Sequence, residues 1–178
     1  KENLKYSTEL SLKDVVKLVK DYGIVGLGGA TFPCHVKLNV KEDKEIKYII
    51  INAAECEPYL TCDHRVMLEY TEEIIGGLRI LLELFPKALI YIGIEDNKLN
   101  AIDKFKSILG EDNKIKVMPL KSKYPQGSEK HLIYALTKLQ VPSRKLPLDI
   151  GCIVFNVSTI YQLYASLING LPLTERII

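Results

Sequence analysis

A short glycine-rich stretch followed by a lysine is the part of this sequence best suited to hold a charged ligand. The stretch reads GLGGA over 26–30, and Phe32 and Lys37 follow it. Glycine lacks a Cβ atom, so its backbone adopts positive φ angles readily and can bring successive N–H groups against an anion. Lys37 can add a point charge to a phosphate. From spacing alone, a connector loop with an ordinary surface lysine explains the same residues equally well.

The stretch is similar to a dinucleotide-binding fingerprint but lacks the context of one. That fingerprint requires a strand before the glycines and a helix after them. Here a predicted helix ends at Tyr22, before the glycines, and Phe32-Pro33 follows them. Thr31 also stands where the third glycine is expected. The sequence therefore argues against a Rossmann-type NAD loop and leaves a phosphate-binding role for the glycines open.

Four apolar runs rich in β-branched residues alternate with segments of helical periodicity. The strands are expected over 47–52, 88–94, 115–119 and 152–156, and the helices over 11–22, 65–85, 96–109, 127–139 and 158–170. Asp96 or Asn97 is expected to cap the third helix, and Ser158 the last. Gly76 and Gly77 fall inside the longest helix, where close packing or a helix break would explain them. The alternation predicts an α/β fold: a mainly parallel four-stranded sheet with helices on both faces, in a three-layer, Rossmann-like arrangement.

Polar or charged side chains follow each predicted strand. They are Asn52, Glu55 and Glu57 after the first, Glu95, Asp96 and Asn97 after the second, Lys121, Lys123, Tyr124 and Glu129 after the third, and Asn156, Ser158 and Thr159 after the fourth. In open α/β sheets, ligands bind in the crevice outside the carboxyl ends of the strands. Polar residues also serve solubility at such positions. The clustering favours a site at this edge of the sheet without identifying the ligand.

Composition and charge limit the classes of function. The 178 residues are 47% hydrophobic and carry a net charge of +2, which predicts a single globular domain over 1–178. The basic residues are scattered among acidic ones, so we expect no nucleic-acid partner. No apolar run reaches the roughly 18 residues of a membrane span. The chain begins with Lys rather than Met, and we expect it to be a fragment of a larger subunit.

The four cysteines do not form a known metal or cluster motif. Cys34, Cys56, Cys62 and Cys152 match neither the paired Cys-x2-Cys of zinc sites nor the cysteine runs that hold iron–sulfur clusters. We therefore expect reduced thiols and no metal site.

Five segments, taken in order, resemble RnfC, a subunit of the Rnf electron-transport complex. They are GIVGLGGATFPCHVKL, INAAECEPYLTCDHRVM, IGIEDNK, PLKSKYPQGSEKHLIYAL and FNVST. The resemblance runs over 21–169 and extends to the flavoprotein subunit of respiratory complex I. It implies a domain that binds FMN and NADH and exchanges hydride between NAD(H) and FMN in ferredoxin:NAD oxidoreduction. An RnfC-like donor of electrons to proline reductase is similar as well, and the motifs leave that alternative open.

The resemblance also implies which residues bind the cofactors. It matches Lys37 to a contact with the flavin phosphate region and Phe32 to packing against the adenine of NADH. The full set that it implies for cofactor binding is Gly26, Gly28, Gly29, Phe32, Lys37, Asn52, Tyr124, Gly127, Glu129, Asn156 and Thr159. In this set Asn156 and Thr159 are matched to the ribityl phosphate of FMN.

Two carboxylates are the catalytic residues that the resemblance implies. Glu55 is matched to a flavin contact and Glu57 to the acid beside the nicotinamide, where they would orient the carboxamide or tune the flavin potential. Hydride transfer requires no general acid or base, so no catalytic triad is expected. Thr31, Ala54 and Ser128 replace a glycine, an aspartate and a glutamate of the complex I pattern. These changes imply that FMN is held differently than in complex I.

Partners and location follow from the same resemblance. In the family, electrons leave FMN through 4Fe-4S clusters on a cysteine-rich segment, which we expect in a part of the subunit outside this chain. The expected partners are NADH, FMN and the other subunits of a membrane electron-transport complex. The expected location is cytoplasmic, peripheral on the inner face of the cell membrane.

Two other classes of function stay open. One is a flavin-free module that docks an iron–sulfur or membrane complex, which the replacements at Ala54 and Ser128 favour. The other is a regulatory domain that binds an anion or nucleotide through the glycine-rich stretch alone. Titration with FMN separates both from the redox domain.

Overall fold

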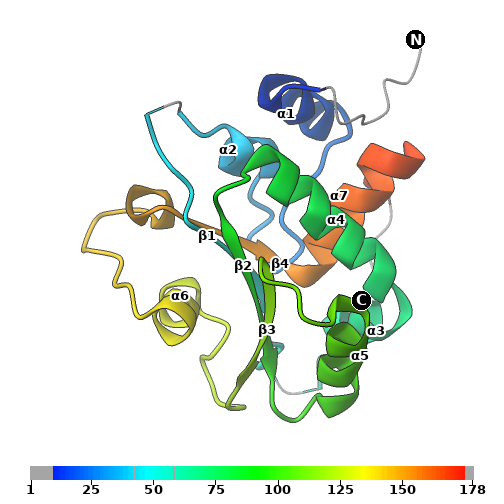
Figure 1. Ribbon diagram of the computed structural model, residues 1–178, viewed down its shortest axis with the longest axis vertical. Helices are drawn as coiled ribbons and strands as arrows, with labels where there is room; N and C mark the ends of the chain where they lie inside the picture. The colour runs from blue at the N-terminus through cyan, green and yellow to red at the C-terminus, as the bar shows by residue number, and fades with distance from the viewer. Residues whose placement is uncertain (1–9, 42, 58, 175–178) are drawn as a thin grey trace.

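Four parallel strands form the centre of the fold (Figure 1). The computed structural model describes residues 10–41, 43–57 and 59–174. Its strands are β1 (Tyr48–Ala53), β2 (Leu89–Glu95), β3 (Ile115–Leu120) and β4 (Cys152–Asn156), in the spatial order β3-β2-β1-β4. Each neighbouring pair is parallel. The mainly parallel four-stranded sheet predicted from the sequence is confirmed.

Helices cover both faces of the sheet, as the alternation predicts. They are α1 (Leu12–Asp21), α2 (Cys34–Leu38), α3 (Cys62–Glu69), α4 (Thr71–Leu84), α5 (Leu99–Leu109), α6 (Glu129–Thr137) and α7 (Val157–Asn169), with a 3-10 turn η1 (Pro147–Ile150). In Figure 1, α6 lies on one side of the sheet and α3, α4, α5 and α7 lie on the other. None of the helices in the described part of the chain is long and apolar enough to cross a membrane.

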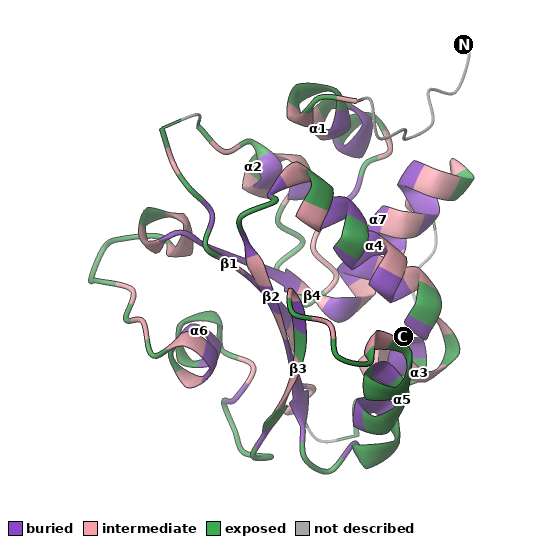
Figure 2. Cartoon of the chain, viewed as in Figure 1, coloured by how far each residue is buried: buried purple, intermediate pink, exposed green. Residues whose placement is uncertain are grey.

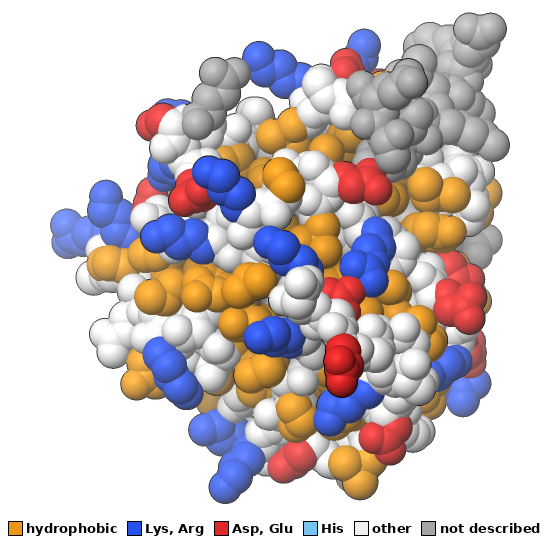
Figure 3. Space-filling model, viewed as in Figure 1, with side chains coloured by type: hydrophobic (Ala, Val, Ile, Leu, Met, Phe, Trp, Pro, Cys, Tyr) orange, Lys and Arg blue, Asp and Glu red, His pale blue; other side chains and the backbone are white. Residues whose placement is uncertain are grey.

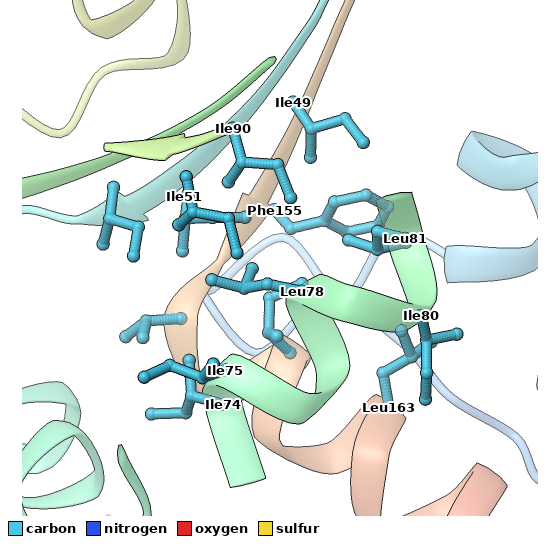
Figure 4. Close-up of a cluster of buried hydrophobic side chains, with 14 of the residues drawn as sticks. Ile49, Ile51, Ile74, Ile75, Leu78, Ile80, Leu81, Ile90, Phe155 and Leu163 are labelled. Atoms are coloured by element: carbon cyan, nitrogen blue, oxygen red, sulfur yellow. The ribbon is translucent and has the colours of Figure 1, made fainter. Parts of the chain in front are cut away.

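The central strand β1 is buried on both faces, which explains its run of three isoleucines over 49–51. Ile49 and Ile51 belong to the larger core, where Figure 4 shows them near Leu78 of α4 and Phe155 of β4. Ile50 points to the smaller core beneath α6. Figure 2 shows the same division, with buried residues on the sheet and on the helix faces turned toward it.

The long helix predicted over 65–85 is wrong, because the structure has two helices there. α3 ends at Glu69 and α4 begins at Thr71, with Tyr70 between them at φ −124° and ψ 37°, outside the helical region. The bend sets the Tyr70 ring against Tyr161 of α7, with ring centroids 4.3 Å apart. A contact between residues so far apart in the chain leaves no local signal in the sequence.

Several predicted boundaries also need correction. The helix after β2 begins at Leu99 and has no side-chain cap from Asp96 or Asn97. The helix predicted over 127–139 is confined to Glu129–Thr137. The last helix is capped by Asn156, not by Ser158. Helices α2 and η1 were not predicted, because each has only five residues or fewer and shows little periodicity.

The glycine pair in α4 permits close packing and does not break the helix. A Cβ atom added at Gly77 would lie 2.8 Å from both the carbonyl oxygen and the Cγ2 atom of Ile160 in α7. One added at Gly76 would meet the ring of Tyr164. α4 therefore approaches α7 through a surface that has no room for side chains at these two positions.

Gly77→Ala is expected to destabilise the fold although alanine is the better helix former. The new methyl group meets a backbone carbonyl that cannot rotate away, and overpacking of this kind costs about 1–3 kcal/mol. Urea denaturation should show the free energy of unfolding lowered by up to about 2 kcal/mol once the helix preference of alanine, about 1 kcal/mol, is subtracted. Gly76→Ala is the matched control, with a smaller loss, because the Tyr164 ring can move. A Gly77→Ala protein as stable as the wild type would contradict this account.

Candidate functional site

The register of the sheet brings two asparagines side by side at its carboxyl edge. Asn52 at the end of β1 pairs with Asn156 at the end of β4. The side-chain amide of Asn52 donates to the carbonyl of Gly127 at 2.8 Å, and its oxygen accepts from the backbone N–H of Ala54 at 3.2 Å. A Cβ atom added at Gly127 would lie 2.8 Å from the Ala54 carbonyl. The segment before α6 is thus held tightly against the end of β1.

The glycine-rich segment folds into a hairpin-like loop, residues 25–33, which we call the glycine loop. Val25 and Pro33 form an antiparallel bridge, and the N–H of Gly26 donates to the carbonyl of Phe32 at 2.8 Å. At its tip, Gly29 has φ 114° and Thr31 has φ 50°. Thr31 therefore adopts a backbone conformation that favours glycine.

The glycine loop lies against the start of α7. The N–H of Leu27 donates to the Thr159 hydroxyl at 2.9 Å. A Cβ atom added at Gly28 would lie 3.1 Å from Cβ of Asn156. Gly26, Gly28, Asn156 and Thr159 are therefore brought together, as the expected crevice requires.

The first turn of α7 is organised by one asparagine and one aspartate. The Asn156 side-chain oxygen accepts from the N–H groups of Ser158 and Thr159 at 2.9 and 3.3 Å, which caps the helix. Its amide nitrogen donates to one oxygen of Asp63 at 2.7 Å, and the Ser158 hydroxyl donates to the other at 2.5 Å. Asp63 was not among the predicted site residues, because the helix predicted to begin at residue 65 actually begins at Cys62 and includes it.

Glu55 bonds to α3 in this structure. One of its oxygens accepts from the N–H of Asp63 at 2.9 Å and the other from the N–H of His64 at 3.4 Å. The Cys62 thiol donates to the same carboxylate at 3.3 Å. Because Thr61, the residue before the helix, makes no side-chain cap, Glu55 satisfies the first amides of α3 in its place.

Three of the predicted residues surround one mostly apolar opening of about 420 Å³, here called the apolar cavity. They are Phe32, Lys37 and Glu129. The Lys37 amine donates to the carbonyl of Val154 at 2.7 Å, lies 3.8 Å from the Glu129 carboxylate and sits 5.9 Å from the centre of the Phe32 ring. The cavity therefore combines an aromatic face with one amine and one carboxylate.

A second opening of about 440 Å³, the polar cavity, lies at the ends of β1, β2 and β3. Glu55, Glu57 and Tyr124 line it. Beneath it, Glu95 and Lys98 form a buried ion pair with 3.0 Å between carboxylate and amine. The pairing leaves neither buried group without a hydrogen-bond partner.

Exposed apolar side chains gather around the two cavities. Ten large hydrophobic side chains are exposed among the described residues, and six of them line the cavities: Phe32, Val36, Leu146, Tyr59, Leu60 and Tyr124. Figure 3 shows hydrophobic side chains interspersed with lysines and arginines over one face. Exposed aromatic and aliphatic groups around hollows are typical of ligand or partner sites.

The cysteines are free thiols in the structure. Burial raises the pKa of Cys34 to about 12 and that of Cys152 to about 11. Burial, followed by the hydrogen bond to Glu55, raises the pKa of the Cys62 thiol. The raised pKa keeps Cys34, Cys62 and Cys152 in the thiol form at neutral pH, which makes them poor nucleophiles. Within the described ranges, no group of three or more His, Cys, Asp or Glu side chains is placed to hold a metal ion.

Residues 19–165 match the family described as the Nuo51 FMN-binding domain. The chain belongs to this family. The match covers both the glycine loop and the Asn52 and Asn156 strand ends.

Two curated relatives agree with the motifs read from the sequence. The chain is 47% identical over 162 residues to the C subunit of the Na(+)-translocating ferredoxin:NAD(+) oxidoreductase complex of Acetobacterium woodii, covering 91% of this chain. It is 45% identical over 169 residues to the C subunit of the proton-translocating ferredoxin:NAD(+) oxidoreductase complex of Clostridium ljungdahlii, covering 95% of this chain. The resemblance to RnfC is confirmed. The chain spans 37% of the length of each relative.

Solved structures share the fold at low sequence identity. Crystal structures of NAD+-reducing [NiFe]-hydrogenase in the air-oxidized and H2-reduced states align with TM-scores of 0.76 and 0.71, at 19% and 21% identity. The alignments cover 92% and 93% of this chain and 31% and 32% of those chains. They agree with the α/β fold predicted from the sequence.

The pKa of Asp63 predicts how stability depends on pH. Burial raises this pKa above its ordinary value of 3.8, and the hydrogen bonds from Ser158 and Asn156 offset only part of the rise. At pH values between the pKa of Asp63 in the unfolded state and its higher pKa in the native state, the native state binds more protons. The contribution of Asp63 to stability therefore falls as the pH rises through this range.

Asp63→Asn cannot titrate. The free energy of unfolding of the wild type minus that of Asp63→Asn is therefore expected to decrease as the pH rises through that window. Urea denaturation at several pH values between about 3.5 and 6.5 measures it. A difference that is constant or grows with pH would contradict the raised pKa.

Proposed function

We propose that this chain is the FMN- and NADH-binding domain of a larger RnfC-like subunit, and that it carries hydride exchange between NAD(H) and FMN in ferredoxin:NAD oxidoreduction. One observation supports this most directly. The glycine loop lies on the start of α7, through Leu27 and Thr159, beside the register pair Asn52 and Asn156. Glycine-rich backbone, helix N–H groups and strand-end amides thus lie together at one edge of the sheet, where α/β folds bind ligands.

The residues present suit the phosphate and ring system of FMN. Positive φ angles at Gly29 and Thr31 turn the exposed tip of the glycine loop so that its backbone can approach an anion. The amine of Lys37 supplies a positive charge at the apolar cavity. Phe32 and Tyr124 are exposed aromatic side chains at the two cavities and can pack against flat rings.

The residues of this chain bind and orient, while the redox chemistry belongs to the cofactor. When bound, FMN supplies a two-electron acceptor for the hydride of NADH and can release electrons singly. Asn52 fixes the Gly127 segment, and Asn156 fixes the start of α7. Glu57 lines the polar cavity and is proposed to orient the nicotinamide carboxamide. Glu55, also proposed to act at the flavin, holds the first turn of α3. Gly26 and Glu129 are proposed to contact the cofactors directly.

The rest of the electron path is proposed to lie outside this chain. The four cysteines in the sequence are not spaced as cluster ligands, so we assign 4Fe-4S clusters to other parts of the subunit. The domain is then one part of a membrane electron-transport complex, held on the cytoplasmic face of the membrane by its other subunits.

FMN titration tests the proposal. Wild-type protein is expected to quench flavin fluorescence, and NADH is expected to remove the visible absorbance of the bound oxidised flavin. Gly28→Val should reduce FMN affinity at least tenfold, since even a single Cβ atom at this position lies 3.1 Å from Asn156 Cβ. The loss of visible absorbance separates an enzyme from a carrier of flavin.

Ser107→Val is the matched control. Ser107 is an exposed residue of α5, which contacts β3 at the opposite edge of the sheet from β4. It should leave FMN affinity unchanged. No quenching by the wild type would favour the flavin-free docking module, and unchanged affinity in Gly28→Val would remove the glycine loop from the flavin site.

A further inference from the structure

Asp63 is a partly buried carboxylate that the proposed cofactor contacts do not use. It is the second residue of α3, and each of its side-chain oxygens accepts one side-chain donor: Asn156 at 2.7 Å and Ser158 at 2.5 Å. Both donors belong to the first turn of α7 or to its cap. Asp63 therefore ties the start of α3 to the start of α7.

The bond to Asp63 determines how Asn156 is oriented. The oxygen of Asn156 is committed to the N–H groups of Ser158 and Thr159. Its amide nitrogen must then find an acceptor elsewhere, and Asp63 supplies one. An amide in place of Asp63 has only one oxygen for two donors and would turn its own NH2 group toward one of them.

A continuous set of hydrogen bonds leads from Asp63 to the glycine loop. Asp63 holds Asn156, Asn156 holds the N–H of Thr159, and the Thr159 hydroxyl accepts from the N–H of Leu27. Gly28, the next residue, lies directly over Asn156. The position of the loop tip thus depends on a carboxylate that lies on another helix.

Charges around Asp63 come from both flanking elements. Glu55, two residues after β1, lies close enough to disfavour the negative charge of Asp63, while Lys98, the residue before α5, favours it. The N–H of Asp63 also donates to Glu55. Asp63 is thus placed between the polar cavity, which Glu55 and Lys98 line, and the glycine loop.

We propose that Asp63 is a positioning residue of the flavin site: by holding Asn156 it fixes the glycine loop against α7 in the geometry that binds FMN. The identity of the ligand, FMN, rests on the proposed function. The part of the proposal that concerns the position of the glycine loop does not. The Leu27 amide reports the position of the loop in ligand-free protein. FMN affinity reports the consequence for binding.

Asp63→Asn is the principal test, made on the full chain. Hydrogen exchange at the Leu27 and Thr159 amides, measured without ligand, is expected to be at least tenfold faster than in the wild type. The Kd for FMN, measured by fluorescence quenching, is expected to rise at least tenfold. Unchanged exchange at Leu27, or a Kd within twofold of the wild type, would overturn the proposal.

Asp112→Asn is the matched control. Asp112 lies just before β3, at the amino end of the sheet and so opposite the proposed site. Its carboxylate accepts from the N–H groups of Lys114 and Ile115 at 2.7 and 2.9 Å and forms an ion pair with Arg79 of α4. This change should lower the Tm while leaving Leu27 exchange and FMN affinity unchanged. Equal effects of the two substitutions would reduce Asp63 to a general contributor to stability.

Two further variants keep the test decisive. In ligand-free protein, the exchanged pair Asp63→Asn with Asn156→Asp can form the same bonds with donor and acceptor reversed, and it should restore Leu27 protection. Ser158→Ala removes one donor and should speed Leu27 exchange a few-fold even if Asp63→Asn does not fold. The proposal would be overturned if the exchanged pair did not restore Leu27 protection and Ser158→Ala did not speed Leu27 exchange. A wild type that does not bind FMN would overturn only the proposed function.

Discussion

The parallel register that sets Asn52 beside Asn156 is the constraint on which the site depends. They form the last register pair between β1 and β4, so both side chains lie where the pairing of these two strands stops. Each uses its amide nitrogen to hold a segment distant in sequence: the Gly127 carbonyl in one case and Asp63 in the other. A shift of either strand by one residue would turn these amides to the opposite face and release both segments.

The hydrophobic core transmits this constraint to the loops. Ile49 and Ile51 fix β1 against the helices, and the Gly77 contact with Ile160 sets the distance between α4 and α7. α7 in turn carries Thr159, whose hydroxyl accepts from the glycine loop. The positions of the polar groups at the strand ends are thus set by apolar packing in which none of them takes part. The loops can carry a binding site because the close-packed core beneath them holds their ends in place.

Alternation of apolar runs with helical segments was enough to predict the four strands and the two-sided layering, because both patterns are local. The spacing of the glycines alone does not decide whether the glycine loop binds a phosphate. Its assignment to cofactor binding rests on the resemblance to RnfC. What could not be predicted depends on contacts across the chain. The bend at Tyr70 accompanies the contact of its ring with Tyr161. Asp63 finds its partners 93 and 95 residues away, and no pattern of neighbours encodes such a meeting.

The bond from Lys37 to the Val154 carbonyl has a consequence for self-association. β4 is an outer strand of the sheet, and outer strands offer backbone groups on which another chain can add a strand, the first step toward ordered aggregates. The lysine occupies one such acceptor with a charged group. The side chain that lines the apolar cavity therefore also disfavours the addition of a strand from another chain at this edge of the sheet.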